Sequence, residues 1–389
     1  MLRYIKSFCL ALMICSRSLT QLLDFPRSSI YIVLLGFMAI FITSLKQIYN
    51  SKKLILISFI GICFALSLWV SGMNKVTVEY LLYFICFGVT SLIIPVIKDF
   101  KLVIQFILLI GLLLVWSYTH IDYTEIVTNL GGMNDNVGAV LMDISYKTLV
   151  FVISGIMLLV IGDNYFIKIG AALIALIYLV ISFIYGARGA LLSVCVFLFV
   201  FWIIRSHNVC ERNKRMWLSA LILLFAIVFF SPIIEYTYTF LESHDIEARS
   251  IERIYYKIAD NESMSVGRDL IYKRAIAGIA GSPILGSGIG SFDNYSGGYP
   301  HNVILQLLYE GGILLAIPLI FLLFKGFFLV FSFKYDPLYR NFLLLLFCSG
   351  VIELFLSSHL WMSLFFWLFI GQTLLCKKYI VKEVCQKNV

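Results

Sequence analysis

The sequence predicts an all-α protein, a polytopic helical bundle that crosses a membrane about twelve times. Hydrophobic residues make up 61% of the 389 residues and charged residues only 13%, whereas soluble domains carry about 25% charged residues. The mean hydropathy is +0.95. A helix crosses the hydrocarbon layer in about 20 apolar residues, and runs of this length cover most of the chain. We therefore expect residues 1–389 to form a single integral membrane domain.

The expected spans follow the apolar runs in chain order. The first, 5–23, contains Arg17 but has no small-residue cleavage site after it, so it is interpreted as a membrane helix and not as a signal peptide. The other expected spans are 29–46, 54–72, 79–97, 102–119, 145–162, 167–185, 189–205, 216–235, 313–332, 341–358 and 360–376.

The distribution of basic residues predicts that both termini lie in the cytoplasm. In that orientation the cytoplasmic loops hold most lysines and arginines, among them Arg3, Lys6 and Lys98. This is the positive-inside pattern, so the net charge of +8 reflects orientation and not nucleic-acid binding. Two longer polar loops, 120–144 and 236–302, are then expected outside the cytoplasm.

The nine cysteines lie in apolar segments or in loops assigned to the cytoplasm, and none lies in the 236–302 loop. Disulfides are therefore not expected. The chain has no CxxC motif and no histidine-rich cluster, so neither a zinc site nor another metal cofactor is expected.

The first part of the large loop is basic. Arg249, Arg253 and Lys257 recur every four residues, which predicts a basic stripe if this segment is helical. Such a stripe could contact anionic lipid headgroups. A solvated helix face is an equally good interpretation.

Arg268 begins a second amphipathic segment, in which Lys273 and Arg274 follow. A guanidinium binds phosphate through two parallel hydrogen bonds and keeps its charge at any working pH. These three residues are therefore candidates for binding a phosphorylated substrate, although each could also be a simple surface charge. The glycines at 286, 288 and 290 that follow are neither a dinucleotide fingerprint nor a P-loop. They predict a flexible turn that brings His301 back to the membrane.

His301 and Asn302 open the next apolar run, and a helix beginning there would place Asn302, Gln306, Tyr309 and Glu310 on one face. Polar side chains at this depth should line a wet cavity. A histidine titrates near pH 6.5, so it can accept a proton from a hydroxyl group at neutral pH. We interpret His301 as a catalytic base, because Asn302 and the glycine-rich approach accompany it; an ordinary histidine at a membrane interface is the alternative.

Two more ionisable residues lie in or beside predicted spans. Arg188, in the sequence IYGARGALLS, falls at a short outer turn between two predicted spans. The charge of an arginine at this interface is energetically costly unless the side chain extends toward water or forms an ion pair. Glu353 lies inside a span, where a carboxylate is a functional candidate that could pair with an arginine. We predict that Arg188, Arg268 and His301 converge on one outer cavity.

Three motifs in order resemble the O-antigen polymerase and O-antigen ligase superfamily of bacterial inner-membrane proteins. They are GARGALLS around Arg188; SVGRDLIYKRAI followed by SPILGSGIGSF; and His301-Asn302 followed by Gly312. The resemblance begins at Gly186 and runs toward the C-terminus. It departs from the ligase pattern at Leu315, where ligases tend to have a small residue or tyrosine.

The resemblance implies a GT-C-like bundle in the inner membrane with its active site on the periplasmic side. It also implies a metal-independent glycosyltransferase without a cofactor, whose donor is an undecaprenyl-diphosphate-linked oligosaccharide. Arg188 and Arg268 would then bind the diphosphate, His301 would be the general base, and Asn302 would orient the acceptor hydroxyl. Membrane lipid and a chain-length regulator protein are the implied partners.

Three functions remain open on these grounds. A polymerase, which adds glycan to another lipid-linked repeat unit, is favoured by the Tyr-Pro-His-Asn form of the motif and by Leu315. A ligase would transfer the glycan to lipid A-core. A polysaccharide flippase would need internal repeats and charges near mid-membrane, and the sequence has no internal repeat that we detect.

Overall fold

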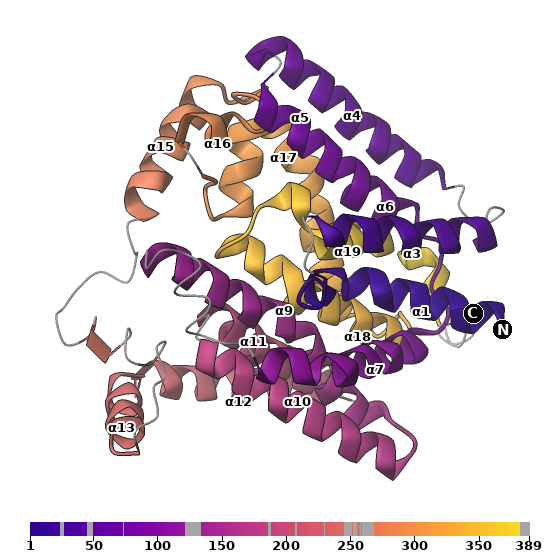
Figure 1. Cartoon of the computed structure of the whole chain (residues 1–389), viewed down its shortest axis with the longest axis vertical. Coiled ribbons are helices and arrows are strands. Elements are labelled where there is room, and N and C mark those ends of the chain that lie inside the picture. The colour runs from indigo at the N-terminus through magenta and orange to yellow at the C-terminus, as the bar shows by residue number, and fades with distance from the viewer. Residues whose placement is uncertain are drawn as a thin grey trace. The chain divides into compact units, whose positions relative to one another are not determined.

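The computed structural model describes residues 1–23, 27–44, 50–72, 74–120, 134–185, 188–206, 208–228, 230–244, 251, 255–256, 258, 268–296 and 298–381. These residues are almost entirely helical and contain no β-strand (Figure 1). The chain divides into two compact units, which are described separately. The predicted basic stripe at Arg249 and Arg253 lies outside the described residues.

The first unit comprises Met1–Ile107 and Gly267–Val389. Its elements are α1 (Leu2–Ile14), α2 (Ser16–Leu19), α3 (Ser28–Ser44), α4 (Ser51–Ser71), α5 (Lys75–Tyr83), the π-helical η2 (Phe84–Val89), α6 (Thr90–Ile93), the start of α7 (Phe100–Thr119), α15 (Arg268–Gly281), α16 (Ser291–Ser296), α17 (Val303–Val330), α18 (Pro337–Leu346), the π-helical η3 (Phe347–Val351), the 3₁₀ helices η4 (Ile352–Phe355) and η5 (Leu360–Met362), α19 (Leu364–Leu374) and the 3₁₀ helix η6 (Cys376–Tyr379).

The second unit comprises Leu108–Val266. It contains the end of α7, α9 (Asn134–Ile161), α10 (Tyr165–Tyr185), α11 (Arg188–Ile204), α12 (Val209–Val228) and α13 (Phe230–Glu242). The pair α9 and α10 packs through small residues: a side chain at Gly155 would meet the Ala171 carbonyl oxygen at 2.7 Å. Thr148 and Ser182 hydrogen-bond through their hydroxyl groups at 2.6 Å. Because α9 begins at Asn134, the end of the expected 120–144 loop is helical.

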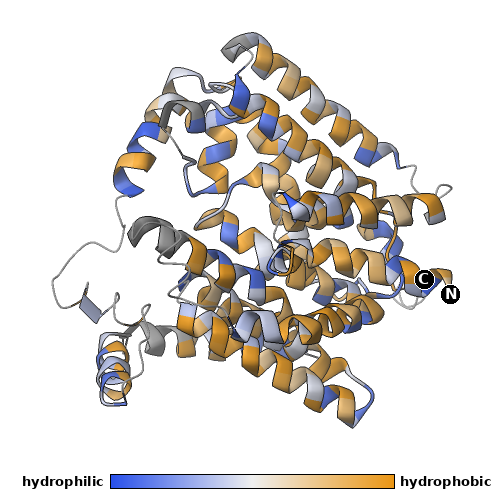
Figure 2. Cartoon of the chain, in the orientation of Figure 1, coloured by the Kyte–Doolittle hydropathy of each residue, from blue (hydrophilic) through white to orange (hydrophobic). Residues whose placement is uncertain are grey.

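Among the described residues, seven helical segments are long and apolar enough to cross a membrane, as expected of a polytopic membrane protein. They are Ser51–Trp69, Lys75–Ile93, Phe100–Thr119, Val140–Ile161, Tyr165–Tyr185, Val303–Val330 and Pro337–Phe355. Three shorter apolar helices are Ser28–Thr43, Arg188–Ile204 and Leu364–Leu374. The expected twelve spans exceed this set. Figure 2 shows hydrophobic residues over most of α4 and α10, whereas α15 carries several hydrophilic ones.

Side chains cap several of these helices. Asn74 Oδ1 accepts the backbone N–H of Thr77 at 2.7 Å at the start of α5, and Asp336 Oδ1 accepts that of Leu338 at 2.7 Å at the start of α18. Asn302 Oδ1 accepts the N–H groups of Ile304 and Leu305 at 3.0 and 3.2 Å and so begins α17. The first N–H groups of a helix have no partner within it, which is why asparagine and aspartate are favoured there.

An aromatic core packs η5 and α19 against α4 and η2. Trp361 lies edge-on to Phe64 with ring centroids 4.7 Å apart, and Phe84 lies 5.0 Å from Trp367 in the same manner. Trp361 and Trp367 are fully buried. Large buried rings contribute strongly to packing, so the short η5 segment, which follows His359, is held rigidly.

Candidate active site

The helix α17 breaks at Gly312, as the Gly311-Gly312 pair suggests. Gly312 has φ 58° and ψ −163°, a conformation open almost only to glycine. A regular helix would pair the N–H groups of Ile313 and Leu314 with the carbonyls of Tyr309 and Glu310. The break leaves these four groups without helical partners, and in a largely apolar surrounding each must find another.

The glycine-rich turn supplies those partners. Ser287 and Gly288 donate their N–H groups to the carbonyls of Tyr309 and Glu310 at 2.7 and 3.0 Å. In return, Ile313 and Leu314 donate to the carbonyls of Pro283 and Ile284 at 2.9 and 3.2 Å. The turn predicted here is therefore docked on α17 through its backbone. We had expected it to be flexible, and the glycines instead permit close approach and positive φ.

Two glycines make this docking possible. Gly286 has φ 72°, and a side chain there would meet the backbone of Glu310 at 2.6 Å. A side chain at Gly312 would meet the Ile284 carbonyl oxygen at 2.3 Å. The position of the glycine-rich turn thus depends on direct contact between its backbone and that of α17. This contact anchors the segment that leads to His301.

His301 lies just before α17 and has φ 52°, which is unusual for a residue other than glycine. Its ring centroid lies 4.3 Å from that of Tyr299. Its Nδ1 atom is buried and has no hydrogen-bond partner among the described residues. Burial lowers the pKa of His301 below its ordinary 6.5, and the charge of Arg268 lowers it further. The imidazole is therefore neutral at pH 7 and able to accept a proton.

Arg268 is the first residue of α15 and is half-buried. Its charge lowers the pKa of His301 and opposes part of the rise in the pKa of Tyr299 that burial causes. Ala275 lies two helical turns further along on the same face of α15 and is fully buried. A side chain at Gly278 would meet the Tyr309 ring at 2.1 Å. Packing of this face on α17 thus places Arg268 toward His301. Lys273 and Arg274, in contrast, are exposed on the same helix.

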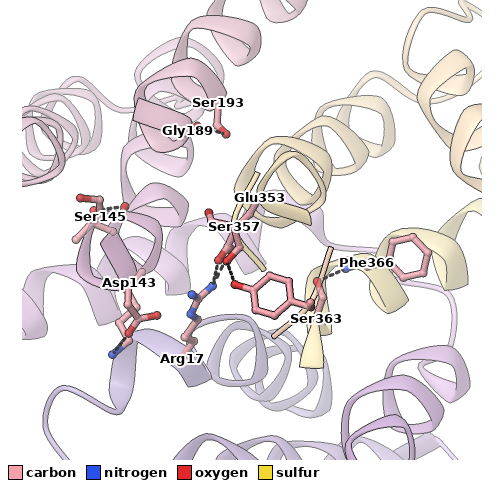
Figure 3. A network of polar contacts seen from close by, with 12 residues as sticks. Arg17, Asp143, Ser145, Gly189, Ser193, Glu353, Ser357, Ser363 and Phe366 are labelled. Atoms are coloured by element: carbon pink, nitrogen blue, oxygen red, sulfur yellow. Dashed lines mark hydrogen bonds and ion pairs between the residues drawn. The ribbon is translucent and has the colours of Figure 1, made fainter. Parts of the chain in front are cut away.

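Tyr299 links His301 to an ion pair whose carboxylate is buried. Its hydroxyl donates a hydrogen bond to the Ser357 carbonyl, and Arg17 forms an ion pair with Glu353 at 2.7 Å (Figure 3). Burial raises the pKa of Tyr299 to about 12, and the Glu353 carboxylate adds to that rise. The predicted pairing of Glu353 with an arginine is confirmed. Its partner Arg17 was missed as a site residue, although an arginine inside an apolar segment is itself a signal.

His359 is a second histidine in this region. It stacks on Tyr80 with ring centroids 4.9 Å apart and lies 5.6 Å from Tyr299. Burial lowers its pKa to about 4. Tyr80 in turn donates to Asp293 at 3.2 Å. Tyr299 thus connects His301 to the ring of His359 and, through it, to that of Tyr80.

The polar face expected along α17 is engaged within the protein. Glu310 is 2% exposed; it accepts hydrogen bonds from Trp361 Nε1 at 2.7 Å and Gln306 Nε2 at 3.2 Å. Tyr309 packs edge-on against Phe292. Asn302 caps the helix with its side-chain oxygen. These residues, expected to face a wet cavity, hold the helix in place in this structure, because buried polar groups need partners.

Arg188 belongs to the second unit, where it is the first residue of α11 and half-buried. Beside it, the Ser193 hydroxyl donates to the Gly189 carbonyl at 2.9 Å (Figure 3). The structure brings Arg268 into electrostatic range of His301, whereas the approach of Arg188 to them stays a prediction. The described residues hold no group of three His, Cys, Asp or Glu side chains arranged for a metal ion.

The fold and these residues define a class: an all-helical membrane protein with a half-buried histidine whose Nδ1 has no hydrogen-bond partner among the described residues and whose pKa is lowered by the charge of an arginine. Residues 170–320 match the family model described as O-antigen ligase. This match spans α10 to the middle of α17 and includes Arg188, Arg268 and His301. The match covers less than half of the chain and supports the resemblance to the O-antigen polymerase and ligase superfamily. No curated protein and no solved structure gave a significant match.

Proposed function

We propose that the protein is a surface-polysaccharide polymerase of the bacterial inner membrane, acting at the periplasmic face. Its donor would be a glycan on a polyprenyl diphosphate, and its acceptor the hydroxyl group of a second lipid-linked repeat unit. The family match supports the general class. The observation that carries the assignment of chemistry is the buried Nδ1 of His301, which has no hydrogen-bond partner in the part of the chain that the structure describes and whose ring is kept neutral by burial and by the charge of Arg268.

The proposed reaction uses these groups in one displacement. His301 takes the proton of the acceptor hydroxyl, whose oxygen forms a bond to the anomeric carbon of the donor sugar. The bond from that carbon to the diphosphate breaks, and the diphosphate leaves with the electron pair. Arg268 would stabilise the charge that develops on the leaving group, because fixed positive charge in a dry site acts strongly on a transition state. Arg188 is proposed to share this role.

Asn302 has a different proposed role from the one expected. Its side-chain oxygen is already occupied by the N–H groups of Ile304 and Leu305. It would therefore act as a positioning residue that fixes the start of α17, and with it the strained backbone of His301, rather than by orienting the acceptor through that oxygen.

The test is polysaccharide chain length in a strain lacking the native gene. His301→Gln should abolish long chains, since loss of a general base costs about 10²–10⁴-fold in rate. Arg268→Gln should also remove long chains, while a low residual rate of polymer formation remains measurable. His244→Gln and Arg205→Gln replace exposed residues of the same types and should restore normal ladders. Wild-type ladders with His301→Gln, at equal membrane expression, would refute the proposed site.

A ligase is the second candidate, favoured by the description of the family model itself. The two functions leave different products in the deletion strain. If single repeat units still reach lipid A-core, the missing step is polymerisation. If long polymer accumulates on the polyprenyl carrier, the missing step is ligation and the polymerase proposal fails.

A further inference from the structure

A separate pocket of about 270 Å³ lies in the first unit, among α1, α3 and the non-helical segment 94–99. It shares no lining residue with the surroundings of His301. Its wall is apolar, formed largely by Leu10, Ile40, Ile94 and Val103. This volume is slightly below the range of about 300–1,000 Å³ found for sites that enclose a whole small molecule, so it suits part of a larger amphipathic ligand.

The polar residues that line this pocket are mostly basic. Arg3, Lys6 and Lys98 contribute three positive charges, and Asp99 contributes one negative charge. The Arg3 guanidinium forms an ion pair with Asp99, and its side chain stays 66% exposed. The pocket therefore keeps a net positive charge while Asp99 orients Arg3 beside it. A ligand that complements it has an anionic head and an apolar tail.

We propose that this pocket binds an anionic phospholipid, with its phosphate among Arg3, Lys6 and Lys98 and the start of an acyl chain against the apolar wall. The remainder of the acyl chain would lie along the outside of α1, where Leu2 and Phe8 are 51% and 39% exposed. Basic pockets between membrane helices on the cytoplasmic side are suited to such headgroups, and all three basic residues belong to the loops that the sequence places in the cytoplasm. The site does not depend on the proposed catalytic function.

The test measures lipid binding to the purified full chain in detergent by native mass spectrometry. The probes are dioleoyl phosphatidylglycerol and dioleoyl phosphatidylcholine, which share their tails and differ in net charge. The wild type should retain phosphatidylglycerol preferentially. Lys6→Gln/Lys98→Gln should weaken its binding about 25-fold, since each basic residue at a membrane surface contributes roughly a factor of five.

The control is Lys52→Gln/Lys377→Gln, which removes the same charge from two exposed lysines outside the pocket and should keep the preference. Equal losses in both double variants would indicate diffuse attraction and overturn the proposal. So would an unchanged preference in Lys6→Gln/Lys98→Gln.

A second variant tests the apolar wall without changing charge. Ser7 is 5% exposed and lines the pocket, so Ser7→Phe should fill it and reduce retention of phosphatidylglycerol severalfold. A thermal melt in detergent without lipid verifies that each variant is folded. If Ser7→Phe is unfolded, the binding measured for Lys6→Gln/Lys98→Gln and its control decides the proposal. A polyprenyl monophosphate that displaces phosphatidylglycerol at equal concentration would assign the pocket to the carrier lipid instead, and would overturn the proposal.

Discussion

Nη1 of Arg17 lies 2.8 Å from Oε1 and 2.7 Å from Oε2 of Glu353, 336 residues further along the chain. The Glu353 side chain is only 5% exposed, whereas that of Arg17 is 38% exposed. The carboxylate is therefore the group that depends on the pair. This contact joins α2 to η4, four residues before the Ser357 carbonyl that receives the Tyr299 hydroxyl.

Replacing Arg17 should destabilise the protein. Arg17→Met removes the guanidinium that lies against the buried Glu353 carboxylate, at a cost of about 3 kcal/mol. Thermal unfolding in detergent should therefore begin several degrees lower than in the wild type. The double variant Arg17→Met/Glu353→Leu removes the uncompensated charge and should recover most of the loss.

The ion pair of Arg27 and Glu79 provides the control. Its atoms are 3.3 Å apart and its side chains are 62% and 34% exposed, and such exposed pairs contribute about 0–1 kcal/mol. Arg27→Met should thus change the melting temperature little. Equal effects of Arg17→Met and Arg27→Met would show that the buried pair has no special importance.

The proposed rate should depend on pH through His301. The neutral imidazole is the active form, and its pKa lies below 6.5. The rate should therefore be level at neutral pH and fall only as the pH drops through this lowered pKa, where His301 becomes protonated. Arg268→Gln removes one cause of the lowering, so the acidic limb should move to higher pH while the residual rate falls.

The measurement is the initial rate of polymer formation in isolated membranes as a function of pH. Arg205→Gln, which removes an exposed arginine, should leave the limb where it is. An acidic limb that stays in place in Arg268→Gln would contradict the electrostatic coupling of Arg268 with His301.

The docked glycine turn should tolerate no side chain. Gly286→Ala and Gly312→Ala each combine a positive φ with a collision against backbone atoms at 2.6 and 2.3 Å. Strain of this kind costs about 1–3 kcal/mol at each position, and the turn must move away from α17. We expect polymer synthesis to fall more steeply than membrane expression.

Gly281→Ala is the matched control. A side chain at Gly281 meets no atom within 4 Å, and this glycine ends α15 without a positive φ. Polymer ladders and melting temperature should therefore stay close to those of the wild type. Comparable damage from all three substitutions would mean that backbone docking is not the reason for the glycines.

The approach of Arg188 to the site can be tested by cross-linking. The background variant has the exposed Cys195 and Cys210, and also Cys385, changed to serine. In this background, cysteines introduced at positions 188 and 268 should be joined by a short bismaleimide. The joined chain is detected by its altered mobility. A pair at positions 188 and 377 should remain unlinked, because the sequence places these on opposite sides of the membrane. Linking of the second pair alone would contradict the predicted convergence.

Helix content and membrane character followed from sequence because they depend on local quantities. An apolar run near 20 residues long must satisfy its backbone internally, and a helix does so within one segment. The break at Gly311-Gly312 was predictable for the same reason. The helix start at Asn302 was also visible in the sequence, but its capping role was not assigned, since an asparagine there can serve either a cap or a substrate.

The site was only partly predictable. His301 and Arg268 stood out because charged and titratable residues are rare in this chain. The contacts of Arg17, Tyr80 and Tyr299 were not predictable, since their partners lie 336, 213 and 58 residues away along the chain. Glu310 was assigned to a wet cavity, whereas Trp361 and Gln306 enclose it.

The sequence by itself determined an all-helical membrane chain with a basic, histidine-containing segment before α17. These properties depend on the hydropathy and residue types of short stretches of sequence, and so they can be predicted without knowing how the helices pack. Only the tertiary structure decided that the glycine turn is docked, that Glu353 pairs with Arg17, and that the pKa of His301 is lowered. Hydrogen bonds, burial and electrostatic coupling act between atoms in space, and the order of residues does not specify which atoms meet.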